Sequence, residues 1–227
     1  MQKLTKLAIV AAAIMMPVAL SASTMTLKFQ SNLAGSHPIT YTDTTGHEII
    51  VTDPTSTAKP LSFGGFKITA DAVGAPELGG LELGDLNTLV RNTSNKWLTL
   101  TITMTQSGLA NLTSPFGLNH AVGGTSTGTG IFTVLLNGVS VNTFTFSPSS
   151  INHVFSNSNT MPLLNTGNDP NGYTLTEIAQ ITLAPGGVAS FDQETWDPPT
   201  VPEPASLSML GLGVLAVGGT IRRRFSL

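Results

Sequence analysis

The sequence predicts an all-β fold, an antiparallel β-sandwich of roughly eight to ten strands, on three observations. Short runs of alternating apolar residues recur through residues 24–196, separated by Gly, Pro, Asn and Asp. An Asn-Gly pair joins two such runs at a spacing typical of a hairpin. The region shows no sustained helical period, and it has no fixed-period repeat of the kind that the alternative, a stacked β-helix, would need.

The clearest strand is predicted at residues 97–105, where apolar residues and threonines alternate. One parity contains Leu98, Leu100, Ile102 and Met104, and the other contains Thr99, Thr101, Thr103 and Thr105. This alternation is typical of a strand with one face in the core and the other in solvent.

A hairpin is predicted from residues 131–136 and 139–146, because Asn137-Gly138 between them suits the two positive φ angles of a tight turn. Further strands are expected at residues 25–29, 47–52, 61–69, 86–90, 173–183 and 188–191. Residues 123–130 contain only Gly, Ser and Thr, and we interpret them as a flexible loop rich in hydroxyl groups.

Composition limits the classes of partner and chemistry. A chain of 227 residues with short segments at both ends leaves room for one domain, here assigned to residues 24–196. Between Thr24 and Val201 the sequence contains five basic residues and twelve Asp and Glu, which gives a net charge of −7. It contains no cluster of basic residues that could bind nucleic acid. The absence of cysteine excludes disulfides, thiolate metal sites, a catalytic thiol and a lipoprotein anchor.

The N-terminal segment has the layout of a secretory signal peptide. Lys3 and Lys6 precede an apolar run over residues 7–20, and the small residues Ser21, Ala22 and Ser23 follow. A charged start, a short apolar run and a small-residue cleavage site define such signals. We therefore assign residues 1–23 to a signal peptide that is cleaved near Ser23.

The C-terminal segment is predicted to cross a membrane. Residues 205–221 carry no charge, and as a helix at about 1.5 Å per residue they would span about 25 Å. The basic tail at residues 222–227, with Arg222, Arg223 and Arg224, favours the cytoplasmic side and places the domain outside. Residues 197–204 hold four prolines and are expected to form a stiff, extended spacer.

Three features occur in order at this end: Pro202, Glu203 and Pro204, then an apolar run rich in Gly and Leu, then the three arginines. Together they resemble the PEP-CTERM protein-sorting signal over residues 202–227. The resemblance implies processing by an exosortase, a membrane-embedded cysteine protease or transpeptidase that removes the tail and releases or re-anchors the body. It also implies a Gram-negative bacterium that makes exopolysaccharide, transient anchoring in the inner membrane, and a final place at the cell surface or in the matrix. A membrane anchor that nothing cuts is the alternative.

The body contains few candidates for chemistry. The loop 165–172 has the oxygen-rich composition of a calcium site, so Asp169 and Glu177 are weak candidate ligands beside the alternative of a plain turn. Glu77, Glu82 and Asp85 could pair as the carboxylates of a glycosidase, although charges at turns are usually only solvated.

Histidine and tryptophan are two other residue types whose side chains suit a functional site. The histidines His37, His120 and His153 are interpreted as isolated loop residues without one. Trp97 shares parity with the outward threonines, which raises the hypothesis of an exposed ring that stacks on a sugar. The favoured interpretation is a tryptophan at a strand start that a loop covers.

The sequence therefore predicts an exported surface or extracellular-matrix protein with a structural or interaction role linked to exopolysaccharide, without enzymatic activity, cofactor or resident metal. Its expected partners are exosortase, the membrane before processing, and exopolysaccharide or matrix proteins. The alternative is an exported carbohydrate-binding module or polysaccharide hydrolase.

Overall fold

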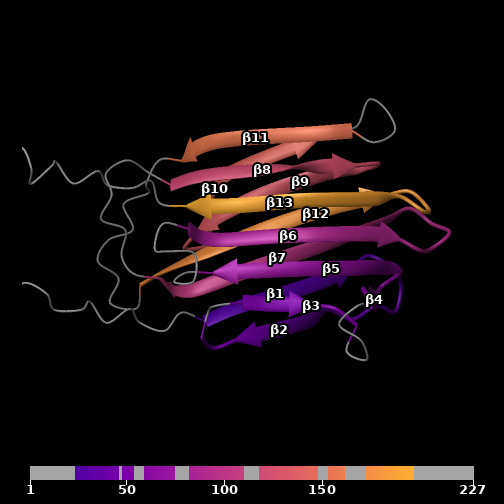
Figure 1. Cartoon of the computed structure of the whole chain (residues 1–227), viewed down its shortest axis with the longest axis horizontal. Coiled ribbons are helices and arrows are strands. Elements are labelled where there is room, and N and C mark those ends of the chain that lie inside the picture. The colour runs from indigo at the N-terminus through magenta and orange to yellow at the C-terminus, as the bar shows by residue number, and fades with distance from the viewer. Residues whose placement is uncertain are drawn as a thin grey trace, which may run out of the picture. The chain divides into compact units, whose positions relative to one another are not determined.

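The computed structural model describes residues 24–45, 48–53, 59–74, 82–109, 118–147, 153–161 and 172–196. These residues all lie in the first of the two units into which the chain divides, Met1–Asp197. They form thirteen strands and no helix, arranged as two antiparallel sheets packed face to face (Figure 1). The predicted antiparallel β-sandwich is confirmed, with more strands than the eight to ten expected.

The six-stranded sheet has the order β10-β9-β12-β7-β1-β2. Its strands are β1 (Thr24–Ser31), β2 (Ile39–Asp43), β7 (Leu98–Leu109), β9 (Thr129–Leu136), β10 (Val139–Phe146) and β12 (Tyr173–Leu183). The seven-stranded sheet has the order β11-β8-β13-β6-β5-β3, and β4 also pairs with β5. Its strands are β3 (Glu48–Val51), β4 (Leu61–Phe63), β5 (Phe66–Gly74), β6 (Glu82–Asn92), β8 (Leu118–Ser126), β11 (His153–Met161) and β13 (Val188–Trp196).

The two strongest local predictions are confirmed. β7 alternates as expected, with its four apolar side chains from Leu98 to Met104 buried and the intervening threonines partly exposed. β9 and β10 form the predicted hairpin, and Asn137 and Gly138 have φ angles of 50° and 78°. Both values are positive, as the tight turn requires.

Two local predictions are wrong in detail. The run at residues 61–69 is a second hairpin, because Gly64 and Gly65 turn the chain with φ angles of 53° and 84°. Residues 123–130 are not a flexible loop, since they end β8 and begin β9. Glycine is needed there for close packing: a Cβ at Gly124 would lie 2.2 Å from the Ser190 carbonyl oxygen.

Several predicted segments lie outside the described residues: the signal peptide at 1–23, the spacer at 197–204, the membrane helix at 205–221 and the basic tail at 222–227. Within the part of the chain that the structure describes, no helix has the length and apolar character needed to cross a membrane.

The core between the sheets consists of a large and a small apolar cluster. Along β12, Tyr173 and Leu175 belong to the small cluster, and Ala179 belongs to the large one. Glu177 lies between them on the same inward face. Five fully buried polar side chains face inward from β7, β8, β12 and β13, and we call them the polar layer: Gln106, His120, Glu177, Gln193 and Thr195.

Candidate functional site

Trp97 is 63% exposed at the point where the chain crosses from β6 to β7. The neighbouring Leu98 is buried, so the parity argument placed the two side chains correctly. No ring or cation–π contact covers the indole among the described residues. The ring is exposed, as the parity hypothesis had it, and the favoured interpretation of a ring covered by a loop is wrong.

The loop that carries Trp97 is held by the side chain of Asn92, which is fully buried. Its Nδ2 donates to the carbonyl oxygens of Lys96, Leu183 and Ala184 at 2.8, 2.9 and 3.1 Å. Its Oδ1 accepts hydrogen bonds from the Ser94 amide and hydroxyl. Because the loop is bonded to a core residue at several points, Trp97 projects from a rigid base.

Neighbouring turns brace the same loop. The Thr93 amide donates to the Gly65 carbonyl at 2.8 Å, and the Asn92 amide donates to the Gly187 carbonyl at 2.9 Å. The Asn32 side chain accepts a hydrogen bond from the Thr99 amide on the other side of Trp97. Turns from both sheets therefore fix this end of the sandwich.

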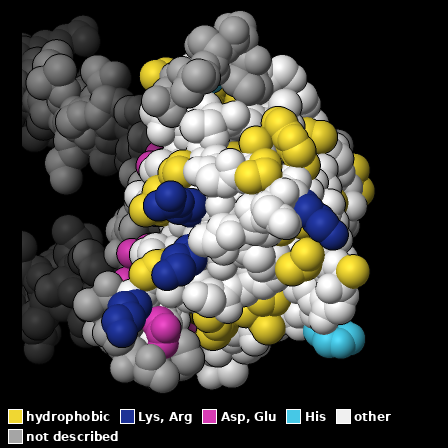
Figure 2. All heavy atoms as spheres, turned by 90° about the vertical axis from the view of Figure 1, so that its right-hand side faces the viewer, with side chains coloured by type: hydrophobic (Ala, Val, Ile, Leu, Met, Phe, Trp, Pro, Cys, Tyr) yellow, Lys and Arg dark blue, Asp and Glu magenta, His cyan; other side chains and the backbone are white. Residues whose placement is uncertain are grey.

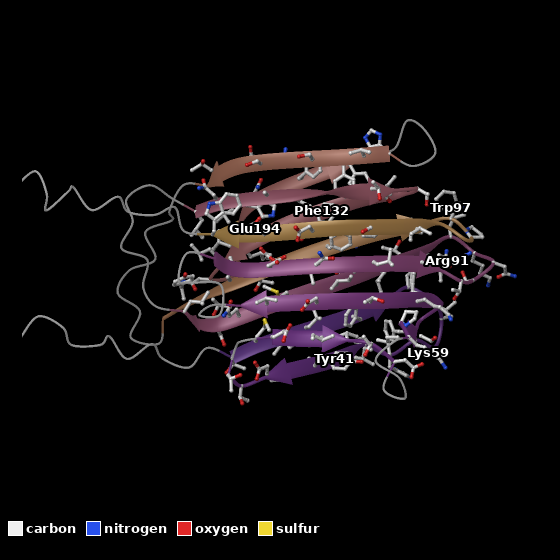
Figure 3. All side chains as sticks on the ribbon, viewed as in Figure 1. Tyr41, Lys59, Arg91, Trp97, Phe132 and Glu194 are labelled. Atoms are coloured by element: carbon white, nitrogen blue, oxygen red, sulfur yellow. The ribbon has the colours of Figure 1, made fainter. Side chains whose placement is uncertain are left out.

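Basic side chains lie toward the same end of the sandwich as the tryptophan (Figure 3). Lys67 on β5 stands opposite Arg91 on β6 in the strand register, and Lys96 directly precedes Trp97; all three side chains are exposed. Figure 3 shows Lys59, Arg91 and Trp97 toward one end of the sandwich and Glu194 toward the other. Figure 2 views this end and shows Lys and Arg side chains distributed among apolar patches. We call Lys67, Arg91, Lys96 and Trp97 the cationic end.

The outer face of the six-stranded sheet is rich in threonine. The hydroxyls of Thr99 and Thr182 lie 2.8 Å apart across β7 and β12, and those of Thr105 and Thr176 lie 3.3 Å apart. Cross-strand hydroxyl pairs stabilise a sheet modestly, by about 0.2–1 kcal/mol each. This face is polar, and Lys28 is the only charged residue on its described strands that faces outward.

Glu177, a candidate calcium ligand in the sequence, is fully buried between the sheets. Its Oε1 accepts a hydrogen bond from the Thr195 hydroxyl, and its Oε2 has no hydrogen-bond partner among the described residues. Gly84 lies beside the carboxyl group, and a Cβ there would lie 2.5 Å from Met104 Cε, so the glycine makes room for the Met104 side chain. The other candidate ligand, Asp169, lies outside the described residues, among which no group of three His, Asp or Glu side chains could hold a metal.

Burial raises the pKa of Glu177 well above its ordinary value, and the hydrogen bond from Thr195 opposes this shift. Three nearby carboxylates raise the pKa further: Asp85, Asp192 and Glu194. The Glu177 side chain therefore keeps its proton at a pH where an exposed glutamate is ionised.

Replacing Glu177 with glutamine is expected to stabilise the folded protein increasingly as the pH rises above about 4.5, the ordinary pKa of Glu. The unfolded chain releases this proton near that pH, whereas the folded chain retains it. Wild-type stability therefore falls by up to about 1.4 kcal/mol per pH unit until Glu177 ionises in the folded state. Urea unfolding of both proteins between about pH 4 and about pH 8 measures the difference.

The exposed Glu48 on β3 provides the control for this change. Glu48→Gln makes the same chemical substitution at the surface, and its effect is expected to stay within about 0.5 kcal/mol over the whole range. A stability difference between Glu177→Gln and wild type that does not grow with pH would contradict the buried, protonated state.

His120 is a buried residue of β8, not the isolated loop residue that the sequence suggested. Its Nδ1 lies 3.0 Å from Nδ2 of Asn142 on β10 in the opposite sheet, and burial lowers its pKa to about 4. Its parity with Leu118 and Val122 was the signal that could have revealed an inward position. His37 lies in an exposed loop as expected, and His153 begins β11.

Of the three acidic residues Glu77, Glu82 and Asp85 that could pair, only Asp85 has a described side chain. Asp85 on β6 stands opposite Glu194 on β13, on the outer face of the seven-stranded sheet. Glu82 is in β6, but its side chain is outside the described set, as is Glu77. The sequence could not reveal the partner of Asp85, because only the β6–β13 register brings Glu194 beside it.

The segment after the sandwich matches a known family. Residues 200–224 match the PEP-CTERM protein-sorting motif. The chain carries a PEP-CTERM motif. The resemblance drawn from Pro202, Glu203 and Pro204 and from the arginines Arg222, Arg223 and Arg224 is confirmed, although these residues lie outside the described structure. The PEP-CTERM motif indicates an exported protein that exosortase processes.

No curated protein matches the chain in sequence. Among solved structures, the chain is similar to TmCBM61 in complex with β-1,4-galactotriose, with 11% sequence identity and a TM-score of 0.37. The match covers 68% of this chain and 92% of TmCBM61. A PA14 sugar-binding domain from an RTX adhesin is similar at 10% identity, 77% and 90% coverage, and a TM-score of 0.32. The CBM36-1 domain of a multidomain xylanase from the hindgut metagenome of Trinervitermes trinervoides is similar at 14% identity, 68% and 100% coverage, and a TM-score of 0.28. At such low TM-scores these likenesses carry no argument about a ligand, so the function is argued from the residues of this chain.

Proposed function

We propose that the protein acts at the cell surface or in the extracellular matrix of a Gram-negative bacterium, after exosortase has processed its C-terminal segment. The observation that carries the proposal is the PEP-CTERM motif at residues 200–224. The charged start and apolar run of residues 1–23 support export. The uncharged run at 205–221, followed by three arginines, supports transient anchoring in the inner membrane.

The β-sandwich serves in this proposal as an interaction domain without enzymatic activity, and exopolysaccharide or another matrix component is its partner. The exposed ring of Trp97 on a rigid loop supports a carbohydrate partner, because an indole offers a flat apolar platform for the C–H face of a pyranose. The strands that carry this loop are held by two packed sheets, so the surface is preformed.

A polysaccharide hydrolase is the second candidate, and the register of β6 and β13 is the observation that favours it. Glycosidases need two carboxyl groups about 5 to 10 Å apart, and Asp85 and Glu194 stand opposite each other. Hydrolysis would appear as new reducing ends when the protein is incubated with the exopolysaccharide of its host. If wild type and the Asp85→Asn/Glu194→Gln double variant yield the same reducing ends, the candidate is eliminated.

Sorting is tested by replacing Pro202, Glu203 and Pro204 with alanine in the native host. The variant is expected to keep its tail and remain in the inner-membrane fraction, whereas the wild-type protein reaches the surface or the medium. A matched control replaces Pro198 and Pro199 with alanine in the same spacer but before the motif, and it is expected to sort normally. Delivery of the motif variant to the surface at the wild-type level would contradict the proposal.

A further inference from the structure

Charge is segregated along the sandwich. The described residues contain five basic side chains, and four of them lie toward the end that carries Trp97: Lys59, Lys67, Arg91 and Lys96. Asp85 and Glu194 lie toward the opposite end of the same sheet. Asp85 and Arg91 are six residues apart on β6, which corresponds to about 20 Å. Asp53 lies beside Lys59, since its amide donates to the Lys59 carbonyl, so the positive charge of this end comes from Lys67, Arg91 and Lys96 (Figure 2).

The cations of this end are available to a ligand. Lys67 and Arg91 are cross-strand neighbours with exposed side chains, and no salt bridge joins them or Lys96 to a carboxylate in the described part of the chain. Neighbouring like charges repel, so a bound anion would relieve the repulsion as well as pair with the guanidinium and ammonium groups. Leu89, two residues before Arg91 on the same face of β6, is 49% exposed and adds apolar surface beside them.

An exposed indole at the same end of the sandwich as several cations (Figure 3) matches one class of polymer. A sugar acid has an apolar C–H face, which can stack on Trp97, and a carboxylate at the ring edge, which can pair with Lys or Arg. Duplex nucleic acid fits less well, because it carries two phosphates per base pair and hides its base faces in the stack, whereas a sugar-acid polymer carries one carboxylate per ring and exposes the C–H face that an indole can stack on.

We infer that the cationic end, Lys67, Arg91, Lys96 and Trp97, binds a linear acidic polysaccharide. This inference rests on the proposed function as an interaction protein of the surface or matrix, and it names the ligand class. β13 ends at Trp196, near Glu194, toward the end of the sandwich opposite Trp97 (Figure 3). The last described residue of the chain therefore lies away from the cationic end.

The mature protein, purified from its native host, is titrated by calorimetry with polygalacturonate as the acidic probe. Trp97→Ala and the triple variant Lys67→Ala/Arg91→Ala/Lys96→Ala are each expected to weaken binding by about tenfold. Binding is also expected to weaken as salt is added, because the charges are exposed. Neutral dextran and a single-stranded DNA oligonucleotide serve as comparison polymers.

Two matched variants control for size and charge. Lys28→Ala removes the one described Lys or Arg side chain that does not lie toward the Trp97 end of the sandwich. Its binding is compared with that of Lys96→Ala. Val139→Ala truncates a side chain that is 54% exposed at the start of β10, and it is compared with Trp97→Ala. Both controls are expected to bind polygalacturonate as tightly as wild type, and unchanged thermal unfolding of all variants shows that they fold.

The inference is overturned if the wild-type protein does not bind polygalacturonate, if it binds dextran or DNA equally well, or if the cationic-end variants bind like wild type. None of these results would affect export or processing, because the titration is independent of sorting. Conversely, a failure of processing would contradict the sorting proposal and leave the titration to decide on the ligand.

Discussion

Replacing Phe132 with alanine is expected to lower the free energy of unfolding by about 4 kcal/mol, because it opens a cavity between the sheets. Phe132 on β9 is fully buried. Its ring centroid lies 5.1 Å from that of Phe191 and 5.5 Å from that of Phe155, both in the seven-stranded sheet, and 5.9 Å from that of Phe146 on β10. The surrounding rings belong to different strands and cannot all move to fill the space.

Ile131 on the same strand provides the control, since it points to the opposite face and is 39% exposed. Ile131→Ala is expected to cost less than about 1 kcal/mol. Urea unfolding of the purified mature proteins measures both changes. Equal losses for the two variants would contradict the role of the Phe132 ring in holding the sheets together.

Asn92→Ala is expected to lower the free energy of unfolding by about 3 kcal/mol, an effect that a single surface hydrogen bond could not produce. The change removes the Nδ2 group that donates to the buried Leu183 carbonyl, whereas the Ala184 carbonyl keeps its hydrogen bond from the Gly187 amide. Unsatisfied buried polar groups cost about 1–3 kcal/mol each, partly offset where water can reach them. The change also removes the acceptor for Ser94, which shapes the loop before Trp97.

Asn95, in the same loop, supplies the comparison because its side chain is exposed. Asn95→Ala is expected to change stability by no more than about 0.5 kcal/mol. Hydrogen exchange adds a local readout: the Ser94 amide, which bonds to Asn92 Oδ1, is expected to lose protection in Asn92→Ala only. Retained protection there would show that the loop does not depend on Asn92.

Strands with one apolar and one polar face were predictable from the sequence, and β7 is the best example. Its alternation fixed the inward position of Leu100 and the outward position of Thr101 before any pairing was known. The β9–β10 hairpin was equally predictable, because Asn137-Gly138 specifies its turn locally. In both cases the signal is contained in a few adjacent residues.

Strands that depend on their neighbours were missed. β11 at the edge of the seven-stranded sheet contains the polar run from Ser156 to Asn159, and β8 contains two adjacent glycines. Such segments have weak β-propensity, and pairing decides their structure. The glycines of β8 suit a strand because β13 lies too close for a side chain at Gly124, a contact that the sequence does not show.

The candidate site was predictable only in part. The parity of Trp97 raised the hypothesis of an exposed ring, but the grouping of Lys67 with Arg91 depends on the β5–β6 register. The polar layer was likewise hidden, since Glu177 and Thr195 belong to strands in opposite sheets. A pattern read along one strand gives the face of a residue and cannot give its partner across the sheet or the core.

The most direct test of the central claim is mass spectrometry of the mature protein's C-terminus in cell fractions, with and without the host exosortase. We expect the chain to lose its tail near residues 202–204 and to be found outside the cell only when the exosortase is present. An intact tail held in the inner membrane of both strains would contradict the account of a sorted surface protein.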